Sequence, residues 1–176
     1  MHIAVGDKLP ETMLIELGAQ GPAPVAVGDL TAGRKVALFA VPGAFTPTCH
    51  QKHVPSFVSA AEDLAGKGVD EIVCVSVNDP FVMKAWGEAT GAASAGIRML
   101  ADPEASFTKA LGLDFSAPPA GLLNRSQRYS MFIEDGVVKV LNVEGSPGEA
   151  ACSLGEALVD QIRGLRCGRR WSPDGR

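Results

Sequence analysis

Apolar runs alternate with amphipathic stretches along the chain and divide it into strands and helices. Residues 36–41 are a continuous apolar run and residues 71–77 are mostly apolar and rich in β-branched side chains, which is typical of buried strands. Residues 46–66 carry apolar side chains at helical spacing, and Asp79 and Pro80 suit the N-cap and first position of a second helix. The remaining predicted elements are a strand over 97–101, a helix over 105–111, strands over 128–134 and 137–143, and a closing helix over 154–163.

The order of these elements predicts the fold class. Residues 1–35 form an irregular first part with short strands, and strands and helices then alternate. The last two strands are joined by Asp135 and Gly136, the strongest hairpin signal in the chain. This order indicates an α/β protein with a mixed central sheet flanked by helices on both faces. We expect one domain over residues 1–163 and a flexible extension over 164–176.

Composition and charge narrow the function classes. The chain is 46% hydrophobic and 20% charged, which is ordinary for a soluble globular protein. A formal net charge of −4 argues against a nucleic-acid-binding surface. No apolar run approaches the roughly 20 residues that span a bilayer, and no signal-peptide pattern follows Met1. We therefore expect a cytoplasmic protein that binds neither nucleic acid nor membranes.

A cysteine lies at the junction between the strand over 36–41 and the helix that follows it. Thr46 suits the N-cap of this helix and Pro47 its first position, so Cys49 would lie about three residues into the helix. The free N–H groups and the dipole of a helix N-terminus favour the thiolate, the nucleophilic form of cysteine. A buried cysteine that acts only as a small apolar side chain fits these neighbours less well.

The chain has three further cysteines besides Cys49, namely Cys74, Cys152 and Cys167. Their spacing is too wide for a zinc finger, no C-x-x-C pattern occurs, and Cys167 is expected to be an incidental thiol. His50 and His53 follow Cys49 at helical spacing, but one turn of helix supplies too few ligands for a metal site. We expect no metal and no cofactor, and we expect His53 to pack or form hydrogen bonds locally.

The chain also resembles a known family. Pro42, Thr46 and Cys49 have the spacing of the peroxiredoxin active-site signature, P-x-x-x-T-x-x-C. The resemblance is to the peroxiredoxin 5 branch (type II, atypical 2-Cys) and covers roughly residues 3–163. Its further matches lie at residues 53–57, 75–82, 100–103, 128–131 and 141–144. It implies a thioredoxin-like fold and a thiol-dependent peroxidase that reduces hydrogen peroxide and alkyl hydroperoxides without metal or haem.

The resemblance implies a role for each matching residue. Cys49 would be the nucleophile that attacks the peroxide and becomes a sulfenic acid. Thr46, Arg128 and the loop at Gly43 would bind the peroxide, and the guanidinium of Arg128 would also favour the thiolate. Pro42 would shield the sulfur from water. Without the resemblance, an arginine at a strand start would be read as a solvated surface charge.

Two cysteines could reduce the sulfenic acid again. Cys152 follows a loop rich in Gly and Pro over residues 144–151, matches the resolving cysteine of animal-type members, and is the preferred choice. Cys74 matches the resolving cysteine proposed for plant-type members, but a buried strand would have to rearrange to allow disulfide geometry.

The resemblance also implies partners and a cellular role. Thioredoxin, or glutaredoxin with glutathione, would be the reductant in antioxidant defence and redox homeostasis. A homodimer would meet near the active-site loops. A redox sensor or holdase that uses the same reactive thiol stays an alternative, because it would need no catalytic turnover.

Overall fold

The computed structural model describes residues 2–166 of the chain, so Cys167 and most of the predicted extension lie outside the described residues. The strands are β1 (Met13–Gly18), β2 (Gly21–Ala26), β3 (Lys35–Val41), β4 (Glu71–Ser76), β5 (Arg98–Ala101), β6 (Asp114–Ala117), β7 (Leu122–Ser126), β8 (Tyr129–Glu134) and β9 (Val137–Val143). The helices are α1 (Val27–Thr31), the π-helical turn η1 (Cys49–His53), α2 (Val54–Gly66), α3 (Pro80–Thr90), α4 (Ser106–Leu111), the 3₁₀ turn η2 (Pro118–Ala120) and α5 (Gly155–Arg166). No helix in this part of the chain is long and apolar enough to cross a membrane.

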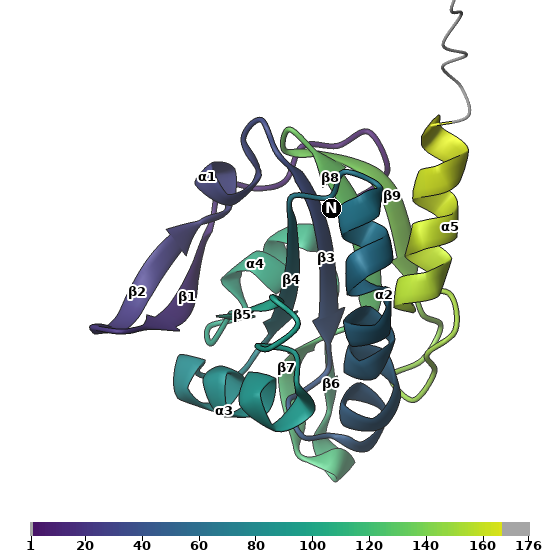
Figure 1. The fold of residues 1–176 in the computed structure, drawn as a ribbon. Coiled ribbons are helices and arrows are strands. Elements are labelled where there is room, and N and C mark those ends of the chain that lie inside the picture. Colours follow the sequence, from purple (N-terminus) through teal and green to yellow (C-terminus); the bar gives the residue numbers. More distant parts are fainter. Residues whose placement is uncertain (1, 167–176) are drawn as a thin grey trace, which may run out of the picture.

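A mixed seven-stranded sheet forms the centre of the molecule, with the strand order β2-β1-β5-β4-β3-β8-β9 (Figure 1). β3 is parallel to β4 and β4 to β5, whereas the other neighbours are antiparallel. Helices cover both faces of the sheet, as the sequence predicts, and this is the thioredoxin-like fold.

Alternate side chains of the central strands supply two hydrophobic clusters, one on each face of the sheet. Phe39 and Cys74 point to the face covered by α2, α3 and α5, and Cys49 belongs to the same cluster. Leu38 and Val73 point to the opposite face, which α1 and α4 cover. The uninterrupted apolar runs in the sequence therefore reflect strands that are buried on both sides.

The cap signal at Asp79 and the turn signal at Asp135 and Gly136 are confirmed. The side chain of Asp79 accepts a hydrogen bond from the Val82 N–H at 2.8 Å, so it caps α3. Gly112 ends α4 in the left-handed conformation, with φ of 73°. Asp135 and Gly136 join β8 to β9 with φ values of 50° and 74°, as a two-residue hairpin turn requires.

One part of the fold differs from the sequence prediction. Residues 114–126 form a small antiparallel hairpin, β6 and β7, which lies outside the main sheet (Figure 1). The two strands are short, with four and five residues, and β7 lacks the regular apolar alternation by which strands are recognised. The 3₁₀ turn η2, which begins at Pro118, joins them. This hairpin matters for function because Arg125 on β7 reaches the loop that precedes Cys49.

The helix over residues 46–66 is also interrupted. The sequence predicts a kink at Pro55, and the structure has a π-helical turn, η1, immediately before α2. In this turn the Val54 N–H bonds to the carbonyl of Cys49, five residues back. Proline lacks the N–H for an ordinary helical bond and its ring crowds the preceding turn. The wider turn thus places Cys49 and His53 in an irregular first part of the helix.

From the sequence we expect Trp86 and Phe81 to pack in the core, and the structure confirms this for Trp86 alone. Trp86 is fully buried, but Phe81 is 60% exposed, so its assignment to the core is wrong. Phe81 lies in the first turn of α3, whose buried residues are Pro80, Met83, Trp86 and Gly87.

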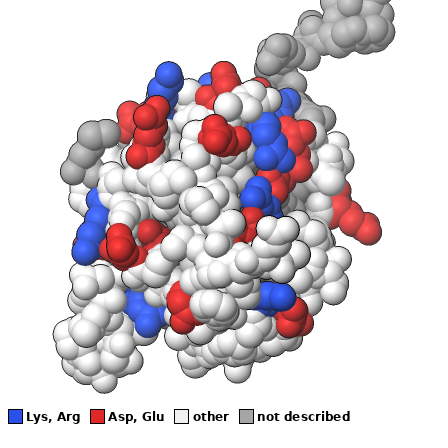
Figure 2. Space-filling model, turned by 90° about the vertical axis from the view of Figure 1, so that its left-hand side faces the viewer, with Lys and Arg blue, Asp and Glu red and all other residues white. Residues whose placement is uncertain are grey.

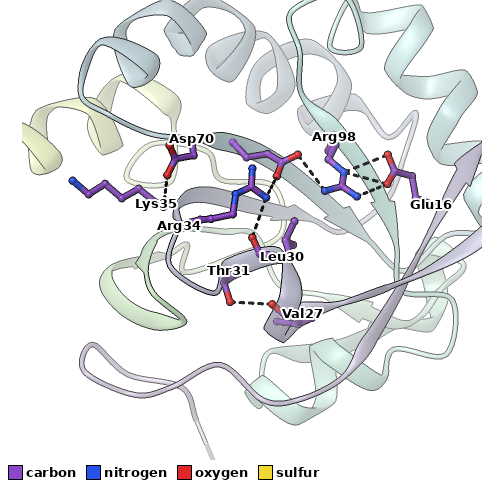
Figure 3. Close-up of polar contacts among 9 residues, drawn as sticks. Glu16, Val27, Leu30, Thr31, Arg34, Lys35, Asp70 and Arg98 are labelled. Atoms are coloured by element: carbon purple, nitrogen blue, oxygen red, sulfur yellow. Dashed lines mark hydrogen bonds and ion pairs between the residues drawn. The ribbon is translucent and has the colours of Figure 1, made fainter.

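A chain of ion pairs ties the β1–β2 hairpin to the central strands (Figure 3). Arg98 on β5 contacts Glu16 on β1 at 2.6 Å and Glu71 on β4 at 3.2 Å. The second oxygen of Glu71 lies 2.7 Å from Arg34. β1 and β5 share a single paired position, Ile15 with Ala101, so the Glu16–Arg98 contact supplements a short ladder.

Charges of both signs alternate over the face of the molecule drawn in Figure 2, which has no broad basic area.

Candidate active site

Cys49 lies in the first turns of the helix that follows β3, as the sequence predicts. The first helical hydrogen bond runs from the His50 N–H to the Thr46 carbonyl at 2.9 Å, so Thr46 is the residue at which the helix begins. Its hydroxyl does not cap a backbone N–H but donates to the carbonyl of Gly43 at 2.7 Å. Cys49 is fully buried.

Arg128 is the polar partner of this buried thiol. It immediately precedes β8, whose Tyr129 pairs with Ala40 near the end of β3, and this register brings the arginine to the loop before the helix. Nη2 of Arg128 donates to Sγ of Cys49 at 3.2 Å. Arg128 is only 2% exposed, so it is not a solvated surface charge. It lies beside the sulfur of Cys49, where the family resemblance places a guanidinium.

His53 holds the other nitrogen of the guanidinium. Its Nδ1 lies 3.1 Å from Nη1 of Arg128, and its Nε2 lies 3.0 Å from the carbonyl of Ser153. A guanidinium only donates and a carbonyl only accepts, so Nδ1 is the acceptor and Nε2 carries the proton. Burial and then the positive charge of Arg128 lower the pKa of His53 to about 3, so the ring is neutral at physiological pH.

The segment between β9 and α5 closes the site from the other side. It lies beside the end of α2 near η1 (Figure 1), and its carbonyl at Pro147 accepts a second hydrogen bond from Nη2 of Arg128 at 2.9 Å. We call residues 144–153 the closing loop. The loop contains no helix or strand, so side-chain contacts contribute to its shape beside a few backbone hydrogen bonds.

Glu144 provides these contacts. One of its carboxylate oxygens accepts hydrogen bonds from the Ala151 N–H at 2.7 Å, the Ser153 N–H at 2.8 Å and the Ser153 hydroxyl at 2.7 Å. Burial alone would raise the pKa of Glu144, but these hydrogen bonds outweigh it and lower the pKa to about 2. The carboxylate is therefore ionised throughout the physiological pH range.

The loop before Cys49 is tightly packed. Pro42 and Gly43 are buried, and the Pro42 carbonyl accepts a hydrogen bond from Nη1 of Arg125 at 3.3 Å. A Cβ atom on Gly43 would lie 2.9 Å from this same nitrogen and 3.1 Å from the methyl group of Thr46. A side chain at position 43 would therefore force Arg125 or Thr46 to move from its present place.

The two candidate resolving cysteines have opposite environments. Cys152 is exposed in the closing loop, and burial followed by the charge of Glu144 raises its pKa. Cys74 is fully buried in β4, and burial followed by the interaction with Cys49 raises its pKa. All three cysteines in the described part of the chain are free thiols, and no group of metal-ligating side chains is found there.

The structure thus brings together Pro42, Gly43, Thr46, Cys49 and Arg128, but neither Cys74 nor Cys152 is bonded to Cys49. Sequence reasoning missed three neighbours of this group, namely Arg125, His53 as a partner of Arg128, and Glu144. A signal was available for His53, because it lies four residues after Cys49 and residues at that spacing share a helix face.

A buried thiol beside a buried guanidinium, at a helix N-terminus of a thioredoxin-like sheet, defines a thiol-based redox protein. The family model described as Redoxin matches residues 4–158. The chain belongs to this family. It is a peroxiredoxin, and so a thiol peroxidase, similar to plant type II members and to peroxiredoxin 5, as the following similarities show.

Among its relatives, the chain is 52% identical to "Peroxiredoxin-2E-2, chloroplastic" of Oryza sativa subsp. japonica over 160 residues, which cover 89% of this chain and 71% of the relative. It is 46% identical to "Peroxiredoxin-2B" of Arabidopsis thaliana, over 91% of this chain and 98% of the relative.

The fold is likewise that of known peroxiredoxins. The structure of reduced Prx3 in complex with hydrogen peroxide from Vibrio vulnificus has a TM-score of 0.86 and 51% identity, over 91% of this chain and 99% of that one. Peroxiredoxin 5 from Alvinella pompejana has a TM-score of 0.79 and 35% identity, over 92% of this chain and 98% of that one.

Proposed function

We propose that Cys49 is the peroxidatic nucleophile of this thiol peroxidase and that Arg128 and Thr46 bind the peroxide. The observation that supports this most directly is the 3.2 Å contact between Nη2 of Arg128 and Sγ of Cys49, because a buried positive charge favours the thiolate. The similar Prx3 was crystallised with hydrogen peroxide, which supports a small hydroperoxide as the substrate.

In the proposed reaction the Cys49 thiolate attacks the terminal oxygen of the hydroperoxide. The S–O bond forms as the O–O bond breaks, so sulfur is oxidised to a sulfenic acid and the peroxide is reduced to an alkoxide or hydroxide, which takes up a proton. Arg128 stabilises the negative charge that moves from sulfur to the leaving oxygen. The hydroxyl proton of Thr46 is directed to Gly43, which leaves its oxygen able to accept a hydrogen bond from the peroxide.

We propose that Cys152 then attacks the sulfenic acid, expelling water and forming a disulfide with Cys49. Its exposed position in the closing loop supports this choice, since the loop can move without breaking the sheet. Cys74 remains the alternative: it interacts electrostatically with Cys49, but β4 is paired on both sides. In either case the backbone must move to reach disulfide geometry.

Peptide mapping by mass spectrometry tests this order of events. The enzyme is treated with one equivalent of hydrogen peroxide, alkylated and digested without reduction. A peptide pair linking Cys49 to Cys152 is expected, and it should be absent from the Cys152→Ser variant. A link between Cys49 and Cys74 would overturn the choice of Cys152.

Thioredoxin, or glutaredoxin with glutathione, is proposed as the reductant that completes the cycle in antioxidant defence. Peroxide consumption is followed with each donor system and with excess dithiothreitol, using Cys49→Ser as the inactive control. Multiple turnovers with one of these donors are expected. One stoichiometric oxidation without cycling under every reductant would instead favour the redox sensor or holdase.

A homodimer that meets near the active-site loops is proposed as the assembly. Phe45 and Phe81 are 53% and 60% exposed, and both lie at the end of the sheet where Cys49 lies, directly after β3 and β4. Sedimentation velocity should give a dimer that Phe45→Ser weakens and Met13→Ser, at an exposed position on β1, does not. A monomer at all concentrations would reject the proposal.

A cytoplasmic location is likewise proposed. Imaging of the tagged full chain in cells tests it.

A further inference from the structure

We infer that Glu144 is a positioning residue for the peroxidase reaction, and that it acts on Arg128 through the closing loop and His53. This inference rests on the proposed roles of Cys49 and Arg128. It does not depend on which cysteine resolves the sulfenic acid, because it concerns the reduced enzyme before peroxide reacts.

A continuous series of hydrogen bonds connects the carboxylate to the reactive sulfur. Glu144 fixes Ser153 by accepting from both its N–H and its hydroxyl. The carbonyl of the same Ser153 accepts from Nε2 of His53 at 3.0 Å. The opposite nitrogen of His53 then accepts from Nη1 of Arg128 at 3.1 Å, and Nη2 of Arg128 donates to Cys49.

A backbone hydrogen bond also joins Glu144 directly to Arg128. The N–H of Glu144 donates to the carbonyl of Arg128 at 2.9 Å, so the two residues are held together at their main chains as well as through the loop. Nη2 of Arg128 is further fixed by the Pro147 carbonyl, which belongs to the same loop. Both terminal nitrogens of the guanidinium therefore depend on the shape that Glu144 gives to residues 144–153.

Glu144 is suited to this role because its carboxylate is buried and hydrogen-bonded within the loop. Its side chain is only 9% exposed, and three donors converge on a single oxygen. Hydrogen bonds to an ionised acceptor are about twice as strong as neutral ones. Without the carboxylate, the Ser153 carbonyl would no longer be fixed opposite His53, and Arg128 would lose the partner that sets its orientation.

The role predicts coupling between Glu144 and Arg128 in the rate of Cys49 oxidation. We expect Glu144→Ala to lower the second-order rate constant for hydrogen peroxide about tenfold, since small errors of position in a catalytic group are costly. In an Arg128→Ala background the same substitution should have less than about a twofold effect, because there is no guanidinium left to orient.

The experiment is a double-mutant cycle by single-turnover stopped flow in the Cys152→Ser protein, with rate constants referred to the titrated Cys49 thiol. Glu149→Ala is the matched control, since Glu149 is an exposed carboxylate of the same loop and should leave the rate constant unchanged. Should Glu144→Ala not fold, Ser153→Ala takes its place in the cycle.

Equal rate losses in both backgrounds would overturn the inference and leave Glu144 with a merely structural role in the loop. A failure of the proposed function would look different. In that case Cys49→Ser would still consume peroxide, or Arg128→Ala alone would leave the rate unchanged.

Discussion

Removing the guanidinium of Arg128 should slow the reaction of Cys49 with peroxide at least tenfold. The side chain is 2% exposed and its donor to Sγ lies at 3.2 Å, so in Arg128→Ala the thiolate loses a buried, charged hydrogen-bond donor. A hydrogen bond to a charged group contributes about 1.5–3 kcal/mol. With about 1.4 kcal/mol for each factor of ten in rate, the expected loss is about 10- to 150-fold.

The assay is stopped-flow fluorescence under pseudo-first-order conditions, in which the observed rate is plotted against hydrogen peroxide concentration. Trp86 is a suitable reporter because its Nε1 donates to His50, the residue after Cys49, at 3.0 Å. Alkylation of Cys49 by iodoacetamide should also be slower in the variant, because the sulfur loses its charged hydrogen-bond donor. Arg128→Lys keeps the charge but cannot contact Cys49 and His53 together. Its rate constant should therefore lie between those of the unmodified protein and of Arg128→Ala.

Arg98→Ala is the control, because it removes another partly buried arginine that pairs with Glu16 and Glu71 away from the site. The reasoning would be refuted if Arg128→Ala, with native circular dichroism, reacted with peroxide within twofold of the unmodified protein.

Three further outcomes are expected. The free energy of unfolding should fall on acidification from about pH 6.5 toward pH 3, because the lowered pKa of His53 makes the unfolded chain bind the proton better than the folded chain. Urea unfolding at several pH values measures this loss. A His53→Gln variant whose free energy of unfolding has the same slope against pH would contradict it. Gly43→Ala should reduce peroxidase activity several-fold by displacing Arg125 or Thr46, whereas Gly28→Ala, with open space around it, should not; steady-state assays of both variants decide. Glu16→Gln should lower the free energy of unfolding by about 0.2–1 kcal/mol, more at low salt, and leave the peroxide rate unchanged; a salt-independent loss would argue against the ion pair as its cause.

The sequence predicted the parts of the fold in which local signals and burial agree. The runs at β3 and β4 and the Asp135-Gly136 turn each carry one unambiguous pattern, and the structure has them where they were expected. The β6–β7 hairpin carries only a short and weak pattern, because its strands have four and five residues, lie outside the main sheet and bury few of their side chains. Arg125 on β7, which contacts the loop before Cys49, was therefore missed.

The site divides in the same way. Cys49 and Thr46 follow from helix-start chemistry, whereas Arg128 was assigned only through the family motif. The connection of Glu144 to Cys49 could not be predicted, because it passes through main-chain atoms of a loop without regular structure. Such contacts depend on where the chain runs and leave no pattern of residue types.

Backbone carbonyls hold most of the side chains around the thiol. Arg125, Thr46, Arg128, His53 and Thr48 bond to the carbonyls of Pro42, Gly43, Pro147, Ser153 and Gly148, respectively. A carbonyl is supplied by any amino acid, so positions 147 and 148 can tolerate exchange of their side chains over evolutionary time. A change in the length of the closing loop would shift all of its carbonyls at once. Insertions and deletions between residues 144 and 153 should therefore be selected against more strongly than substitutions at positions 147 and 148.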